Sequence, residues 1–199
     1  MIKKIFKEGA LILALSISIV LLAILSLNIL LYFSSNDKAR SAYKNDVSSK
    51  NKVEISKNPT LIIPKLEIKA PIVFSTSNNE KQIDVDLRNG ISHRFGTANP
   101  GQKGNVFLVG HSSNYPWEKG DYNQVFAYLN KLETGDILYV DYENKRYTYK
   151  VSGKKIVSPS DVSIENPSDD FRLTLMTCYP PGTTLKRLAV ISELQSAGN

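Results

Sequence analysis

Short runs of apolar and β-branched residues, separated by turn residues, fill the chain from residue 59 to residue 199. Runs of this length bounded by Gly, Pro, Asn or Asp are typical of β-strands. Two stretches instead space their apolar residues three or four apart, which predicts short helices over residues 78–87 and 123–131. Many short strands with few helices indicate an all-β barrel or sandwich. The strands are expected at Thr60–Ile63, Ala70–Phe74, Asn105–His111, Ile137–Tyr142, Arg146–Val151, Ile156–Val157, Leu173–Cys178 and Leu188–Ile191.

A different pattern occupies the N-terminal part of the chain. Residues 10–33 are 24 consecutive uncharged residues, which as a helix rising about 1.5 Å per residue reach about 36 Å. The length of this run, with no small-residue cleavage site after it, predicts a transmembrane signal anchor rather than a cleaved signal peptide. Basic residues flank both ends of the run, so charge alone does not fix its orientation. We expect residues 1–9 to be cytoplasmic, residues 34–58 to form a flexible stalk outside the membrane, and residues 59–199 to form the folded domain.

The positive charge of the chain is unevenly distributed. The formal net charge is +6, yet residues 59–199 carry 16 basic and 15 acidic side chains and are nearly neutral. The basic excess flanks residues 10–33, where it suits anionic lipid head groups or cell-wall polymers. The sequence also contains no nucleic-acid-binding motif, so nucleic acid is not an expected partner.

Cys178 is the only cysteine, so the chain forms no intramolecular disulfide, and the residue is either a buried hydrophobe or a reactive thiol. It ends an apolar strand, Pro180, Pro181 and Gly182 then make a loop, and Arg187 begins the next apolar run. Antiparallel pairing around that loop allows Cys178 and Arg187 to share one face of the sheet. A permanent cation beside the thiol favours the thiolate or stabilises an oxyanion. The sequence therefore predicts that Cys178 is a candidate nucleophile, and Arg187 is either its cationic partner or a surface charge that begins a strand.

A cysteine nucleophile needs a partner that moves protons, and the chain has two histidines. His111 ends an expected strand, whereas His93 follows a turn, where a neutral structural histidine is the ordinary interpretation. His111 is the candidate acid and base, and His93 is the alternative. Thr177, directly before the nucleophile, is a candidate for holding the oxyanion or the substrate, and packing within the strand explains it equally well. The polar loop Ser158–Asp170 leads directly into the cysteine strand and is expected to form one wall of a substrate groove.

These residues together resemble the sortase family. Thr174-Leu175-Met176-Thr177-Cys178, with Arg187 nine residues later, is similar to the TLxTC motif and downstream arginine of sortases, and Gly110-His111 resembles their histidine motif. The resemblance covers roughly residues 59–194. The short, proline-rich loop Tyr179–Thr183 departs from the best-known subfamily and leaves the subclass open, with classes D and E among the options. Further matches lie at Ile63–Leu66, Ala70–Ile72, Asn89–His93, Gly96–Gly101 and Gly104–Asn105.

The resemblance implies a sortase-type closed β-barrel of about eight strands with short helices, preceded by one transmembrane helix. It implies a membrane-anchored cysteine transpeptidase in which Cys178 forms a thioester, His111 moves protons and Arg187 contacts the reacting peptide or the oxyanion. The implied substrate is an LPxTG-like C-terminal sorting signal of a secreted protein. The implied acceptor is a peptidoglycan precursor or another amine, such as a pilin lysine. The catalytic domain is then extracellular and the N-terminus cytoplasmic.

Two other classes of protein remain compatible with the sequence. A plain thiol protease uses the same cysteine with water as the acceptor, and a non-catalytic membrane-tethered β-domain that binds a wall polymer or a partner keeps Cys178 buried and inert. An L,D-transpeptidase fits poorly, since its nucleophile follows Ser-His-Gly rather than Leu-Met-Thr. No cofactor or metal site is expected, because the acidic pairs Asp84/Asp86 and Asp169/Asp170 lack the spacing of a calcium loop. Some sortases respond to calcium, so calcium activation stays open.

Overall fold

The computed structural model describes residues 55–113 and 120–198. The chain divides into two units, residues 1–54 and residues 55–199, and only the second contains described residues. The expected cytoplasmic N-terminus, the membrane anchor and almost all of the stalk therefore lie outside the described residues. Within residues 55–113 and 120–198, no helix is both long and apolar enough to cross a bilayer.

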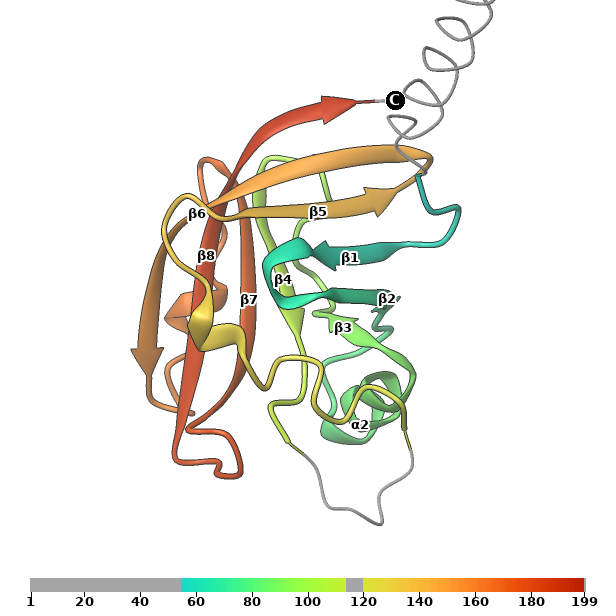
Figure 1. The fold of residues 1–199 in the computed structure, drawn as a ribbon. Coiled ribbons are helices and arrows are strands. Elements are labelled where there is room, and N and C mark those ends of the chain that lie inside the picture. Colours follow the sequence, from blue (N-terminus) through green and yellow to red (C-terminus); the bar gives the residue numbers. More distant parts are fainter. Residues whose placement is uncertain (1–54, 114–119, 199) are drawn as a thin grey trace, which may run out of the picture. The chain divides into compact units, whose positions relative to one another are not determined.

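Eight strands close into a single barrel in the order β1-β2-β3-β4-β7-β8-β6-β5, and β5 pairs back with β1 (Figure 1). This confirms the prediction of an all-β barrel. Neighbouring strands are antiparallel except for β2 with β3 and β4 with β7, which are parallel. The strands are β1 (Thr60–Ile63), β2 (Ile68–Phe74), β3 (Ile91–His93), β4 (Gly104–Val109), β5 (Ile137–Tyr142), β6 (Lys145–Val157), β7 (Phe171–Tyr179) and β8 (Lys186–Gly198).

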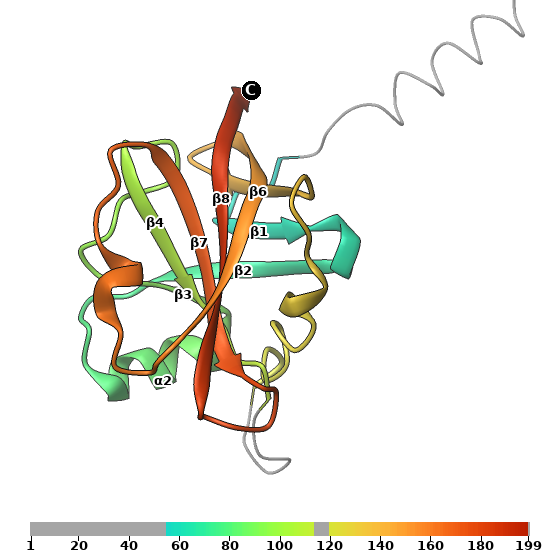
Figure 2. The ribbon, with the colours of Figure 1, turned by 90° about the vertical axis from the view of Figure 1, so that its left-hand side faces the viewer.

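The interior of the barrel is filled by alternate residues of the strands. On β4 these are Val106 and Leu108, and on β7 they are Leu173 and Leu175, all of which are fully buried in the core. Because successive side chains of a strand point to opposite faces, the residues between them point outward. Figure 2 shows the strands β4, β7, β8 and β6 side by side on one side of the barrel. The outward face of these strands carries the site described below.

Helix α2 (Glu80–Asn89) lies between β2 and β3 and confirms the helix predicted over residues 78–87. Asn79 caps its N-terminus by accepting a hydrogen bond from the Gln82 backbone N–H at 3.1 Å, which satisfies one of the free donors of the first turn. Three short 3₁₀ helices, η1 (Pro64–Leu66), η2 (Leu129–Lys131) and η3 (Val162–Glu165), lie in connections between strands.

The helix predicted over residues 123–131 was wrong. Only η2 is helical, and residues 121–128 form successive turns in which, for example, the Val125 N–H donates to the Tyr122 carbonyl. The apolar residues that suggested a helix are Phe126 and Leu129, which pack into the barrel core together with Leu132. Packing into the barrel therefore overrides the weak helical pattern of this segment.

Several strands also differ from the prediction: β3, which ends at His93, was not predicted, and β8 is much longer than the expected Leu188–Ile191. β4 ends at Val109, so His111 lies two residues beyond the strand rather than at its end. The segments predicted as separate strands at 146–151 and 156–157 belong to one strand, β6. The register of β6 against β8 shifts between Val151 and Gly153, and this irregularity lets one long strand bend without ending.

Candidate active site

Strands β7 and β8 place Cys178 directly opposite Arg187. The antiparallel register pairs Thr177 with Leu188, Cys178 with Arg187 and Tyr179 with Lys186. Cys178 is three residues after the interior residue Leu175, so it belongs to the outward set of β7, and Arg187 precedes the interior residue Leu188 and also points outward. Both side chains are partly exposed. The thiol and the guanidinium therefore share the outward face, as the loop between the two strands predicts.

The backbone around His111 is held beside the same end of β7. The parallel register of β4 and β7 runs to Val109 opposite Met176. It continues through a hydrogen bond from the Gly110 N–H to the Met176 carbonyl at 3.1 Å, so the residue before His111 lies beside the end of β7. The Phe126 N–H donates to the His111 carbonyl at 2.9 Å and fixes the backbone from its other side.

Gly110 packs tightly against the barrel core directly before the histidine. It lies on the inward side, where an added Cβ would be 2.5 Å from the ring of the fully buried Phe126. Only a residue without a side chain fits there. The backbone that leads into His111 is thereby held close to the core.

The environment of His111 favours its neutral form. Burial lowers the pKa of His111, and the negative charge of Asp84 on α2 partly opposes this effect. Among the described residues, the Nε2 atom of His111 is buried and has no hydrogen-bond partner. A neutral imidazole with an unsatisfied ring nitrogen is suited to accept a proton from a thiol or an amine.

Arg187 is positioned by the loop that precedes it. Its Nη1 donates to the carbonyl oxygens of Thr184 and Lys186, both at 3.1 Å. A guanidinium has five N–H donors, and these two bonds use Nη1 alone. The arginine is therefore held at the site end of β8 by its own loop while it remains partly exposed.

Thr177 lies on the inward set of β7 and is buried. Its hydroxyl donates to the Gly110 carbonyl at 2.8 Å. This bond ties the strand of the cysteine to the residue before His111, so the observed contact of Thr177 is with the protein backbone. A role for Thr177 at the oxyanion or the substrate stays a prediction.

His93 lies on the interior side of β3. Its register partner on β4 is Leu108, an interior residue. The imidazole stacks on Phe74 at a centroid distance of 4.5 Å, its Nε2 lies 2.9 Å from the Ala98 carbonyl oxygen, and burial lowers its pKa. These contacts are those of a neutral structural histidine.

Ser113 was missed in the sequence. Its hydroxyl accepts a hydrogen bond from the Gly182 N–H at 2.9 Å, which joins the β7–β8 loop to the segment after His111. The two segments are 69 residues apart in the chain. The sequence indicated this contact only indirectly, because Ser113 follows the candidate residue His111 by two positions.

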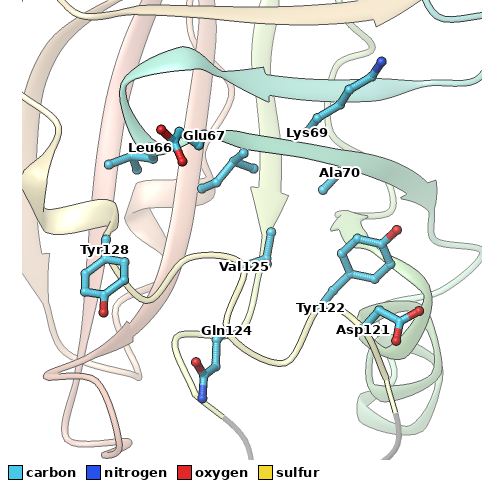
Figure 3. Close-up of a pocket in the computed structure, with 10 residues that line it drawn as sticks. Leu66, Glu67, Lys69, Ala70, Asp121, Tyr122, Gln124, Val125 and Tyr128 are labelled. Atoms are coloured by element: carbon cyan, nitrogen blue, oxygen red, sulfur yellow. The ribbon is translucent and has the colours of Figure 1, made fainter.

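A second site is a pocket of about 330 Å³ between two segments of the chain (Figure 3). One segment is β2 with the turn before it, and the other is residues 121–128. Its lining includes the carboxylates of Glu67 and Asp121 and the rings of Tyr122 and Tyr128. None of its lining residues belongs to β4, β7 or β8, so it is separate from the cysteine site. In the part of the chain that the structure describes, no group of three or more His, Cys, Asp or Glu side chains could hold a metal ion.

The fold and the candidate site together define a class of protein. Its members have a closed eight-stranded barrel with a cysteine, a histidine and an arginine at one end of the β4, β7 and β8 strands. The family model for the sortase domain matches residues 61–195, and the chain belongs to the sortase family.

Relatives and solved structures agree with this assignment. Sortase SrtE1 of Streptomyces coelicolor is 32% identical over 148 residues, which are 67% of this chain and 39% of that protein. Sortase D of Bacillus subtilis is 31% identical over 121 residues, which are 60% of this chain and 53% of that protein. The chain thus spans about half or less of the length of these relatives. The crystal structure of sortase E1 from Streptomyces coelicolor, with a tripeptide in its active site, is 28% identical, covers 71% of this chain and 89% of that chain, and has a TM-score of 0.59.

Proposed function

We propose that this protein is a membrane-anchored cysteine transpeptidase. It cleaves an LPxTG-like C-terminal sorting signal of a secreted protein and transfers that protein to an amine of the cell wall. The observation that carries the proposal is the register that pairs Cys178 with Arg187, together with the hydrogen bond that holds Gly110, the residue before His111, against β7. The tripeptide in the active site of the related sortase E1 supports a peptide as the substrate class.

The first half-reaction forms a thioester. The Cys178 Sγ attacks the carbonyl carbon of the scissile peptide bond, and the thiol proton passes to the neutral imidazole of His111. The negative charge that develops on the carbonyl oxygen faces the guanidinium of Arg187, which stabilises it. The C–N bond then breaks, and the imidazolium of His111 gives its proton to the leaving amine.

The second half-reaction transfers the acyl group. An acceptor amine attacks the thioester carbonyl and loses a proton to His111. The C–S bond breaks, the sulfur takes that proton back, and the new amide leaves with the thiol restored. A peptidoglycan precursor supplies the amine in this proposal. Residues 10–33 anchor the enzyme in the membrane with the barrel on the extracellular side, where exported substrates emerge.

The test uses the full-length protein in nonionic detergent, an LPxTG-type peptide and triglycine as the acceptor. Intact-protein mass spectrometry should show a thioester on Cys178, and peptide mass spectrometry should show the triglycine-joined product. Both should be absent in Cys178→Ala. Cleavage without transfer would instead identify a thiol hydrolase. No reaction, together with a Cys178 that resists iodoacetamide until the protein unfolds, would refute catalysis and favour a binding domain.

A further inference from the structure

Strand β6 is longer than the neighbour that closes the barrel against it. β5 pairs only with the first six residues of β6, whereas β8 pairs with β6 to its end on the other side. Val151 still has partners beside β5, because its N–H donates to the Asp136 carbonyl at 2.9 Å and its carbonyl accepts from the Gly135 N–H at 2.8 Å. Beyond Val151, the described residues form no backbone hydrogen bond with the side of β6 that faces away from β8. Residues 153–157, the β6 edge, are therefore an edge strand.

The β6 edge is open to solvent. Lys154, Lys155 and Ile156 are all exposed, and Ile156 is 58% exposed although it is apolar. A Cβ built on Gly153 would meet no atom within 4 Å. Figure 1 shows this end of β6 at the outside of the barrel, on the left. An exposed edge presents unpaired N–H and C=O groups, which form a template for an additional strand.

A pocket of about 360 Å³ adjoins the β6 edge. The Nζ atom of Lys154 donates to the carbonyl of Asn130 in η2 at 2.8 Å, which holds this lysine beside the pocket. Leu188 is buried and Tyr179 is half-buried, so these two side chains form an apolar floor. The pocket can therefore take an apolar side chain of a ligand that lies along the edge. Its lining residues are Asn130, Lys154, Lys155, Ile156, Tyr179 and Leu188.

The charge of the pocket favours an acidic ligand. Among the described residues that line it, Lys154 and Lys155 carry a charge, and both are positive. Asp136 attracts Lys154 and Asp161 attracts Lys155, but neither lysine forms an ion pair with a described residue. Pairing of two copies through the β6 edge would bring the lysines of both copies together, and like charges on facing strands are destabilising. The edge is therefore better suited to an acidic strand than to a second copy of this chain.

The β6 edge lies in one row with the cysteine site. Val157 pairs with Arg187 on β8, and Arg187 pairs with Cys178 on β7. Because neighbouring strands are about 4.8 Å apart, a strand added to β6 would run about 15 Å from the Cys178 backbone. Tyr179 and Leu188, which line the pocket, directly adjoin Cys178 and Arg187 in the sequence. A segment bound at the edge is thus held close to the site while Cys178 stays uncovered.

We propose that the β6 edge is a docking site that takes an extended acidic segment of a partner protein by strand addition. The edge binds the segment through backbone hydrogen bonds, and the neighbouring pocket selects its side chains. Lys154 and Lys155 contact carboxylates of the segment, and one of its apolar side chains lies in the pocket beside Ile156. None of these contacts uses the Cys178 thiol, so the docking site goes beyond the proposed transpeptidase chemistry and does not depend on it.

The test measures binding of a fluorescein-labelled peptide, Thr-Glu-Val-Glu-Leu-Glu-Thr, to the full-length protein in nonionic detergent. Alternating glutamate and apolar residues give this probe one acidic and one apolar face as a strand. A second probe has lysine in place of each glutamate. A third keeps the glutamates but has methylated backbone nitrogens, so it retains the charge and cannot donate to the edge. Comparison of the three probes on the wild-type protein needs no variant.

Fluorescence anisotropy should show saturable binding of the acidic probe to the wild type and, equally, to Cys178→Ala. The lysine probe and the methylated probe should each bind at least about tenfold more weakly. Deuterium uptake in residues 153–157 should slow with the acidic probe and not with the methylated one. The double variant Lys154→Glu/Lys155→Glu should raise Kd at least about tenfold. Lys150→Glu is the matched control, because it changes an exposed lysine where β6 is paired on both sides, and it should raise Kd less than about twofold.

Four outcomes would overturn the proposal. The first is that the acidic probe does not bind the wild type. The second is that the methylated probe binds as well as the acidic one, since charge alone then explains binding. The third is that Lys150→Glu weakens binding as much as the double variant does. The fourth is uptake in residues 153–157 that is slow in the free protein and rises on dilution, which would show that a second copy occupies the edge. Normal binding of the acidic probe by a protein that forms no thioester would count against the proposed function alone.

Discussion

Adding one methyl group at Gly110 should damage both the stability and the activity of the protein. The Cβ of an alanine would lie 2.5, 2.8 and 3.0 Å from three carbons of the Phe126 ring, whereas ordinary contacts begin near 3.4 Å. Gly110 cannot move away easily, because its N–H donates to the Met176 carbonyl and its own carbonyl accepts from the Thr177 hydroxyl. The fully buried Phe126 must therefore shift.

The expected cost follows from overpacking a closed core. Gly110→Ala should lower the free energy of unfolding by about 1–3 kcal/mol. For a domain of this size that corresponds to a decrease in Tm of about 2–10 °C. Because the Phe126 N–H donates to the His111 carbonyl, movement of Phe126 also displaces the histidine. Acylation by the LPxTG-type peptide should slow by about 10- to 100-fold.

Urea denaturation and the rate of thioester formation test this prediction. Gly153→Ala is the matched control, because a Cβ at Gly153 meets no atom within 4 Å, and its free energy of unfolding should change by less than about 0.5 kcal/mol. Phe126→Leu should cost less in the Gly110→Ala background than alone, since the smaller side chain relieves the clash. Wild-type stability and acylation in Gly110→Ala would refute the argument that the packing of Phe126 against Gly110 fixes the backbone at His111.

Three further predictions concern single groups. Arg187→Ala should lower kcat/KM about 100-fold, and Arg187→Lys should give a kcat/KM between those of the wild type and Arg187→Ala. In urea denaturation, the free energy of unfolding of both variants should change by less than about 0.5 kcal/mol. In the folded protein, burial lowers the pKa of both His93 and His111 below 6.5. At a pH between these lowered pKa values and 6.5, the unfolded chain therefore binds more protons than the folded chain. The free energy of unfolding should therefore fall as the pH drops below 6.5, and less steeply in His93→Gln; a flat profile between pH 7.5 and 5.5 would contradict this. Asp141→Asn should cost about 2–3 kcal/mol in urea denaturation, because the fully buried Asp141 carboxylate accepts two hydrogen bonds from Arg146 at 2.7 Å; a loss below about 0.5 kcal/mol would show that the pair contributes little.

Local patterns in the sequence carried much of the fold. The pairing of Cys178 with Arg187 follows from two apolar runs joined by a short loop, where the contact is close in sequence and the register depends on few residues. The capped helix α2 and the β5–β6 hairpin are equally local. The conformation of residues 123–131 could not be assigned correctly, because it depends on the packing of Phe126 and Leu129 into the barrel core.

Contacts across the barrel could not be derived from patterns. The approach of His111 to Cys178 depends on parallel pairing of β4 with β7, and the Thr177–Gly110 bond that accompanies it joins residues 67 apart. Resemblance to sortases supplied that expectation where spacing did not. Asn105 was noted only as part of the family match at Gly104–Asn105. Its contacts gave no local signal, because its three partners are between 59 and 69 residues away.

The parallel pairing of β4 with β7 also bears on when the protein becomes reactive. During folding, contacts between residues close in sequence form before contacts that must close a long loop. The β7–β8 hairpin can therefore bring Arg187 to Cys178 early, whereas His111 arrives only when β4 docks on β7. A partly folded chain should carry a thiol without its proton acceptor until that docking is complete. If the proposed acyl transfer holds, it would then begin only in molecules that have finished folding, and partly folded chains would not modify their neighbours.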